Sequence, residues 1–206
     1  NKTDMKPMKE LMHNIPNLKI IIAMFITTMI VQASVMSIDP IVSLYVKEMM
    51  HDKGNIAFVA GVVAATPGLG NLLSASKVGH IMDEIGPEKV LMAGLIIATL
   101  LFIPMTFTTS PWMLAFWRFL LGLTNSGLMP AAQTILTLDV PDEAFGRIFS
   151  YNQSFQAAGS VFGALLGSMI SGISTYSMVF AFTGITLFIN IWIYVACRNK
   201  KATVNN

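Results

Sequence analysis

The sequence predicts an all-α integral membrane protein, a six-transmembrane-helix bundle, and three observations support this fold class. Apolar residues make up 54% of the 206 residues and charged residues only 12%, about half the charged share of a soluble domain. The mean hydropathy is +0.64, so lipid has to cover part of the apolar surface. The apolar residues also form six stretches long enough to cross a bilayer as helices, which takes about 20 residues each.

The first half of the chain contains a polar start and three of the six spans. Residues 1–17 are polar and basic, which predicts a cytoplasmic linker lying on the membrane surface. The first span, about residues 18–46, is interrupted by an Asp-Pro pair, because proline removes a backbone hydrogen bond and can kink a helix. The second span (about 56–76) and the third (about 90–107) are separated by the polar turn KVGHIMDEIGPEK.

The second half contains three further spans and a polar tail. The connection TTSP is very short, so the fourth span, about residues 112–138, should lie antiparallel beside the third. The fifth span, residues 146–172, carries no charge after its second residue. The sixth span, about residues 178–196, precedes a polar cytoplasmic tail at 198–206. We therefore expect one transmembrane bundle over residues 18–197.

Basic residues predict how the bundle sits in the membrane, because Lys and Arg collect on the cytoplasmic side. An even number of spans puts both ends of the chain on one side. That side holds ten basic residues and the opposite side two, so both termini should be cytoplasmic. The ten are Lys2, Lys6, Lys9, Lys19, Lys77, Lys89, Arg147, Arg198, Lys200 and Lys201, and the two are Lys47 and Lys53.

Arg118 lies inside the fourth span, about 10 Å along its helix from the outer end. Gly122, Asn125, Met129 and Gln133 follow it at steps of four, three, four and four, which keeps all five on one side of a helix. A cation at the head of such a face can hold a partner carboxylate, helix carbonyls or a substrate. Alternatively, Arg118 snorkels to the outer surface.

Asp39 is the only carboxylate predicted inside a span, and it shares a face with Thr28, Gln32 and Ser43. It could pair with Arg118, attract cationic cargo, or bind and release a proton, since burial favours the neutral form of a carboxyl group. The alternative is a solvated acid at the outer mouth of the bundle.

The fifth span carries amides in its first half and glycines in its second, all on one face: Asn152, Gln156, Gly159, Gly163 and Gly167. The glycines allow another helix to approach closely, so we expect a packing surface there. Amides inside a membrane need partners, so they should bond to other helices or line a wet cavity. The candidate substrate-cavity residues are therefore Gln32, Asp39, Arg118, Asn125, Met129, Gln133, Asn152 and Gln156.

Motifs of catalysis and of metal or cofactor binding do not occur in the sequence. It has no HExxH, no GxSxG, no P-loop and no glycine-rich dinucleotide motif, and its three histidines lie in separate polar segments. The one cysteine, Cys197, excludes an internal disulfide. We therefore expect a non-enzyme with no metal, no cofactor and no nucleic-acid partner. The first apolar stretch is too long for a signal peptide, and the opening Asn suggests a fragment of a longer chain.

Three motifs resemble those of one family of transporters. The cytoplasmic turn from Gly79 through Asp83 to Gly86 resembles the G-x-x-x-D-x-x-G signature of the major facilitator superfamily. RFLLG in the fourth span is similar to the R-x-x-x-G of that family's motif B, and the glycine ladder of the fifth span resembles its antiporter motif. The segments SIDPIVSLYV, GPEKVL, RFLLG and GRIFSYNQSF resemble the second half of bacterial multidrug efflux proteins of the drug/proton antiporter family.

This resemblance implies one half of a major facilitator fold, spans seven to twelve of a twelve-span antiporter in a bacterial plasma membrane. The turn would form a cytoplasmic gate motif, in which Asp83 caps a helix or meets a cationic side chain. Two departures alter this expectation. Glu84 stands where the family usually has a basic residue, and Ala164 and Ser168 replace the Pro and the second Gly of the antiporter motif.

The function that we expect is proton-coupled export of amphipathic, cationic or neutral drugs by alternating access. The partners would be the N-terminal six-helix half of the same transporter, the lipid bilayer, the drugs and protons, with the proton-coupling carboxylate in that other half. The polar faces of the first, fourth and fifth spans would meet across a cavity formed with that missing half. Two other interpretations stay open: a six-span channel or receptor-like binding module acting as a homodimer, and a membrane scaffold without transport.

Overall fold

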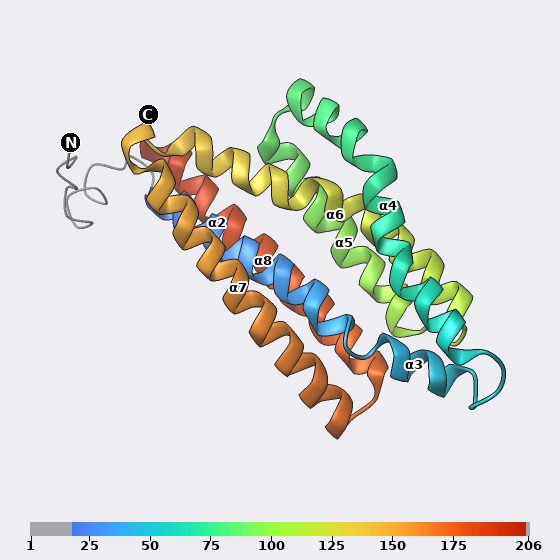
Figure 1. Ribbon diagram of the computed structural model, residues 1–206. Helices are drawn as coiled ribbons and strands as arrows, with labels where there is room; N and C mark the ends of the chain where they lie inside the picture. Colours follow the sequence, from blue (N-terminus) through green and yellow to red (C-terminus); the bar gives the residue numbers. More distant parts are fainter. Residues whose placement is uncertain (1–17, 205–206) are drawn as a thin grey trace, which may run out of the picture.

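The structure is a computed structural model that describes residues 18–204, and over this range every regular element is a helix (Figure 1). The predicted linker at residues 1–17 lies outside the described residues, as do the side chains of the predicted tail beyond Arg198. In chain order the helices are α2 (Leu18–Ile38), α3 (Val42–Met49), α4 (Ile56–Ile85), α5 (Pro87–Thr106), α6 (Pro111–Asp139), α7 (Asp142–Ile173) and α8 (Tyr176–Val204).

The long helices form two groups of three, which lie side by side in Figure 1. Helices α2, α7 and α8 pack together, and so do α4, α5 and α6. The groups meet where α2 contacts α6 and where α5 contacts α8, while the short α3 packs against α4. The start of α2, the end of α8, the α4–α5 turn and the α6–α7 connection all lie at one end of the bundle (Figure 1).

Five of the described helical segments are long and apolar enough to cross a membrane: Leu18–Ile38, Ile56–Ile85, Pro87–Thr106, Glu143–Ile173 and Tyr176–Arg198. Helix α6 has 29 residues, which is sufficient length, but it contains Arg118, Asn125 and Gln133. These polar side chains lower its hydropathy, so α6 needs its neighbours to cover them. The expected fourth span is therefore the polar member of the bundle.

Helix boundaries follow the positions of proline and glycine. The first predicted span is divided into α2 and α3 by residues 39–41, where Pro40 has no N–H to donate and the Ile41 N–H bonds to the Ile38 carbonyl at 3.0 Å. Helix α4 runs beyond the predicted end of the second span to Ile85, and Gly86, with a φ of +90°, separates it from α5. Helix α8 likewise continues to Val204, because no Gly or Pro follows to end it.

Helix α2 is the centre of its group. Over its membrane-length window 56% of the residues are buried, against 17% for the corresponding window of α7. Three glycines of the fifth span lie directly against the α2 backbone, where a Cβ on any of the three would overlap a carbonyl oxygen. The facing pairs are Gly159 and Met29, Gly163 and Ala33, and Gly167 and Ser37. Because both members of the pairs advance by four residues, α2 and α7 are parallel and in close contact over two helical turns.

Candidate functional site

A groove of about 540 Å³ opens between α2, α4 and α6. It follows the seam where the two groups of helices meet, and each of the three helices contributes polar side chains to it. The residues that carry chemistry along its wall are Gln32 and Asp39 from α2, Asn71 from α4, and Arg118, Asn125, Ser126 and Met129 from α6.

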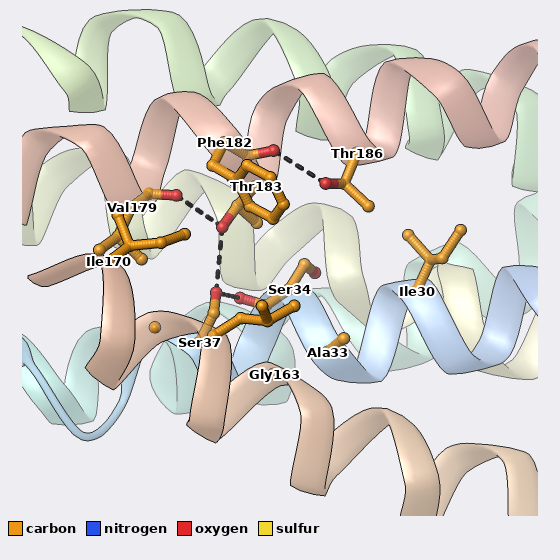
Figure 2. Close-up of a pocket in the computed structure, with 12 residues that line it drawn as sticks. Ile30, Ala33, Ser34, Ser37, Gly163, Ile170, Val179, Phe182, Thr183 and Thr186 are labelled. Atoms are coloured by element: carbon orange, nitrogen blue, oxygen red, sulfur yellow. Dashed lines mark hydrogen bonds between the residues drawn. The ribbon is translucent and has the colours of Figure 1, made fainter.

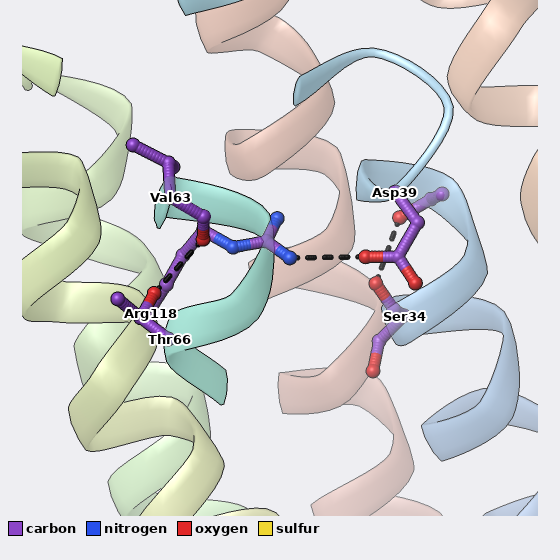
Figure 3. Close-up of polar contacts among 6 residues, drawn as sticks. Ser34, Asp39, Val63, Thr66 and Arg118 are labelled. Atoms are coloured by element: carbon purple, nitrogen blue, oxygen red, sulfur yellow. Dashed lines mark hydrogen bonds and ion pairs between the residues drawn. The ribbon is translucent and has the colours of Figure 1, made fainter. Parts of the chain in front are cut away.

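An ion pair closes the seam between α2 and α6. Arg118 extends from α6 beside the Val63–Thr66 turn of α4 and reaches Asp39 at the end of α2 (Figure 3). Its Nη2 donates a hydrogen bond to Oδ1 of Asp39 at 3.0 Å. The Arg118 side chain is 4% exposed and that of Asp39 is 45% exposed. Arg118 therefore holds a partner carboxylate and does not extend to the outer surface.

The guanidinium of Arg118 is incompletely satisfied. Its Nε and Nη1 are buried and have no hydrogen-bond partner among the described residues. A buried cation depends strongly on the acceptors that it does have, because desolvation of the charge is costly. The ion pair with Asp39 therefore offsets part of the free-energy cost of burying the Arg118 charge.

Two close backbone approaches set the spacing of the groove wall between α4 and α6. Gly122 lies against the backbone of Pro67, and Gly70 lies against the backbone of Phe119 and Leu123. A Cβ at either glycine would collide with main-chain atoms, which cannot move aside cheaply. The glycine in RFLLG thus brings the helix that carries Arg118 and Asn125 next to α4.

Five of the eight candidate cavity residues line this groove: Gln32, Asp39, Arg118, Asn125 and Met129. The structure does not bring the other three to it. Gln133 lies one helical turn beyond Met129 on α6 and is not part of the wall.

The amides of the fifth span lie on the face of α7 that packs on α2, and neither lines the groove. Asn152 is fully buried, and its Oδ1 accepts a hydrogen bond of 2.7 Å from Thr28 Oγ1. Gln156 follows one turn later, with a buried Nε2 that has no partner among the described residues. Asn152 and Gln156 therefore do not line this groove, and the expectation that the fifth span faces a cavity shared with the other half stays a prediction. Helix α7 packs on α2, and the three walls of the groove come from α2, α4 and α6.

Hydrogen bonds between polar side chains also join α2 to α8, and they were not predicted from the sequence. Thr27 donates to Oδ1 of the fully buried Asn190 at 3.2 Å, and the hydroxyls of Ser37 and Thr183 lie 3.1 Å apart. Figure 2 shows Ser37 facing Thr183 beside a small cavity of about 40 Å³, with Gly163 of α7 on the other side. Asn190 is an isolated amide in an apolar stretch, FINIWIYV, and that signal could have revealed it.

Asn71 is a second residue that sequence reasoning missed. It lies at the middle of α4, within the second predicted span, and lines the groove opposite α2. Asn71, Gln32 and Asn125 come from three different helices, and none of their side-chain amides is hydrogen-bonded to another described residue. The rule that intramembrane amides need partners, applied to every span, would have singled out Asn71 as well.

The predicted gate motif of Gly79, Asp83 and Gly86 lies at the far end of α4 from the ion pair. Gly86 takes its positive φ there, and a side chain on Gly79 would meet open space. Asp83 is exposed in the last turn of α4 and has no hydrogen bond or ion pair with other described residues. The N-cap of α5 is Gly86, so Asp83 does not cap that helix within this chain.

Comparison with known proteins identifies the family of this chain. Residues 24–206 match the Major Facilitator Superfamily. The chain belongs to this superfamily. It is 42% identical over 205 residues to proteins named "Multidrug resistance protein MdtG" from Salmonella typhimurium and Citrobacter koseri. These alignments cover 99% of this chain but only 51% and 50% of the two relatives, so the chain spans about half the length of the curated relatives it matches.

The superfamily match confirms the family inferred from the motifs, and it agrees with an all-helical half-transporter. Together with the apolar helices, it makes the chain a multi-pass membrane protein of a transporter class that is not enzymatic. Within this major facilitator chain, the groove at the Asp39–Arg118 pair combines charge, amides and free volume in one place.

Proposed function

We propose that this chain is the C-terminal half of a proton-coupled multidrug efflux transporter that exports amphipathic compounds by alternating access. The observation that carries the proposal is the groove of about 540 Å³ whose walls combine apolar side chains with unpaired amides. Ligand pockets characteristically have this composition, a largely apolar lining with a few polar groups. The relatives' name, multidrug resistance protein, supports a drug-like cargo.

The proposal requires a second six-helix half to complete the transporter. Helices α4 and α7 are the least buried of the membrane-length segments, with 22% and 17% of their windows buried. Both carry rows of exposed large apolar side chains, including Leu69 and Leu72 on α4 and Phe162 and Leu165 on α7. Relatives twice as long as this chain have enough sequence for an N-terminal half that covers such faces.

The proposed setting is a bacterial plasma membrane with both ends of the chain in the cytoplasm. The basic residues near the start of α2, the α4–α5 turn, the α6–α7 connection and the end of α8 support this orientation, because these segments share one end of the bundle (Figure 1). The Asp39–Arg118 pair would then lie toward the periplasmic side, and the G-x-x-x-D-x-x-G turn would face the cytoplasm.

The test is transport by the complete native chain in liposomes. A pH gradient is imposed, and the movement of two fluorescent amphipathic dyes, one cationic and one neutral, is followed. Movement of dye that depends on the gradient and stops with a protonophore supports a proton-coupled exporter. Folded protein that moves neither dye, and binds neither in equilibrium dialysis, contradicts the proposal.

The same preparation separates the alternatives. A channel would conduct without stoichiometric coupling to protons, and a scaffold would leave dye movement unchanged in an Arg118→Ala variant that reaches the membrane. An exporter loses efflux in that variant, because the ion pair between the groove walls is broken. The superfamily match favours the exporter over the channel or receptor.

A further inference from the structure

The amides of the groove are its most unusual feature. Gln32, Asn71 and Asn125 lie on α2, α4 and α6, and all three line the same groove. None of their side-chain amides is hydrogen-bonded to another described residue. Each amide offers two donors and one acceptor, and because Asn71 is exposed and Gln32 and Asn125 are half-buried, these groups are open to the groove. Because all three line one open volume, they form a site that can make hydrogen bonds to a ligand in the groove.

The two charged side chains of the groove are paired with each other. Among the described lining residues only Asp39 and Arg118 are charged, and they pair at 3.0 Å. A monocation approaching Asp39 would meet the opposing field of Arg118 directly behind it, so its attraction is largely cancelled. An anion meets the same compensation in reverse, because Arg118 is 4% exposed and enclosed by protein. The pair therefore contributes little net charge toward a ligand.

From these two observations we propose that the groove recognises its cargo through uncharged hydrogen bonds to Gln32, Asn71 and Asn125. The substrate class is an amphiphile with amide, sulfonamide, hydroxyl or carbonyl groups on an apolar body. The inference rests on the proposed transport function and names the cargo class of the same groove. Asn71 becomes a specificity-determining residue, and the ion pair serves to join α2 to α6.

The experiment measures binding to the complete native chain in nanodiscs, with two apolar fluorescent probes of similar size. N-butyl dansylamide carries hydrogen-bonding groups, and pyrene carries none. The variants are Gln32→Met, Asn71→Leu and Asn125→Leu, which remove the amide and nearly preserve the volume. Gln153→Met is the matched control, because Gln153 is an exposed amide on α7 outside the groove.

Each amide variant should raise the Kd of the dansylamide about 2- to 10-fold, the worth of one hydrogen bond, and leave the Kd of pyrene unchanged. The Gln153→Met control should leave both Kd values unchanged. Equal losses for the two probes would indicate altered shape or folding and overturn the inference, as would unchanged dansylamide binding in all three variants. Binding does not require transport, so a failure of efflux in liposomes and a failure of this recognition are distinguished.

A third probe tests the role of charge. A dansylamide with a trimethylammonium group at the end of its butyl chain adds one permanent positive charge. We expect its Kd to lie within tenfold of that of the neutral dansylamide and to rise in the same three variants. A cationic probe that binds more than tenfold more tightly, with no loss in the amide variants, would show that charge selects the cargo and would overturn the inference.

Discussion

The guanidinium of Arg118 and the carboxylate of Asp39 are bonded at 3.0 Å, but the two side chains occupy very different environments. Arg118 is 4% exposed, and two of its nitrogen atoms have no partner, whereas Asp39 is 45% exposed at the edge of the groove. The pair is therefore asymmetric: Asp39 could be solvated without Arg118, but Arg118 has no substitute for Asp39.

This asymmetry predicts unequal effects of removing either partner. Asp39→Ala leaves a buried, unpaired cation and should reduce the free energy of unfolding by about 3 kcal/mol. Arg118→Met leaves a carboxylate that water in the groove can reach, so its cost should be about 1 kcal/mol. Thermal and denaturant unfolding of the complete native chain in detergent would measure both values. The double variant should resemble Arg118→Met alone, and equal or reversed costs for the single variants would contradict this view of the pair.

A second prediction concerns the glycine contact between α7 and α2. Gly163→Ala places a methyl group against the backbone of Ala33, so the helices must separate, at a cost of about 1–3 kcal/mol. Gly172→Ala on the same helix meets nothing within 4 Å and should be neutral or slightly stabilising, because alanine favours the helix. The melting temperatures of the two variants provide the comparison. A Gly163→Ala protein as stable as Gly172→Ala would argue against close contact of α7 with α2.

The third prediction uses the free space in the groove. Gly68 lines the groove, and a Cβ there would contact nothing, so Gly68→Met should fill the groove without disturbing the helices. Binding of an amphipathic probe should weaken at least tenfold, with little change in melting temperature. Gly61→Met is the matched control, since Gly61 lies on the same helix, also meets nothing within 4 Å and does not line the groove. Equal binding by the two variants would mean that the ligand lies elsewhere.

The fourth prediction concerns the buried contact between Thr27 and Asn190. Thr27→Val removes the hydroxyl that donates to Asn190 Oδ1 and leaves a fully buried amide with no partner, at a cost of about 1–3 kcal/mol. The double variant Thr27→Val/Asn190→Leu removes both polar groups and should recover most of that loss. A double-mutant cycle on melting in detergent measures the coupling, and strictly additive losses would show that the two side chains do not interact.

The sequence was sufficient for the helical class, the family and the break at Asp39-Pro40, because each depends on local signals. Hydropathy identifies membrane helices, and proline interrupts them wherever the rest of the chain lies. The steps of three and four residues also placed Arg118, Asn125 and Met129 on one face, and in the structure these three line the same groove.

Helical spacing did not reveal which neighbour each face meets. Asn152 and Gln156 form a polar face as clear as that of Arg118, but the adjacent glycines bring α7 so close to α2 that Asn152 bonds to Thr28 of α2 and neither amide lines the groove. Asn71, on a helix with no continuous polar face, reaches the groove because Gly70 and Gly122 bring α4 against α6.

By itself the sequence determined a membrane-spanning helical chain of the major facilitator superfamily. The apolar composition of each segment indicates that lipid surrounds it, and the short motifs indicate the family. Only the tertiary structure decided that Asp39 and Arg118, 79 residues apart, form one ion pair and that three amides from α2, α4 and α6 converge. The physical reason is that the spacing of residues within one helix determines which of them share a face. Which other helix that face contacts depends on close backbone packing at glycines far away in the chain.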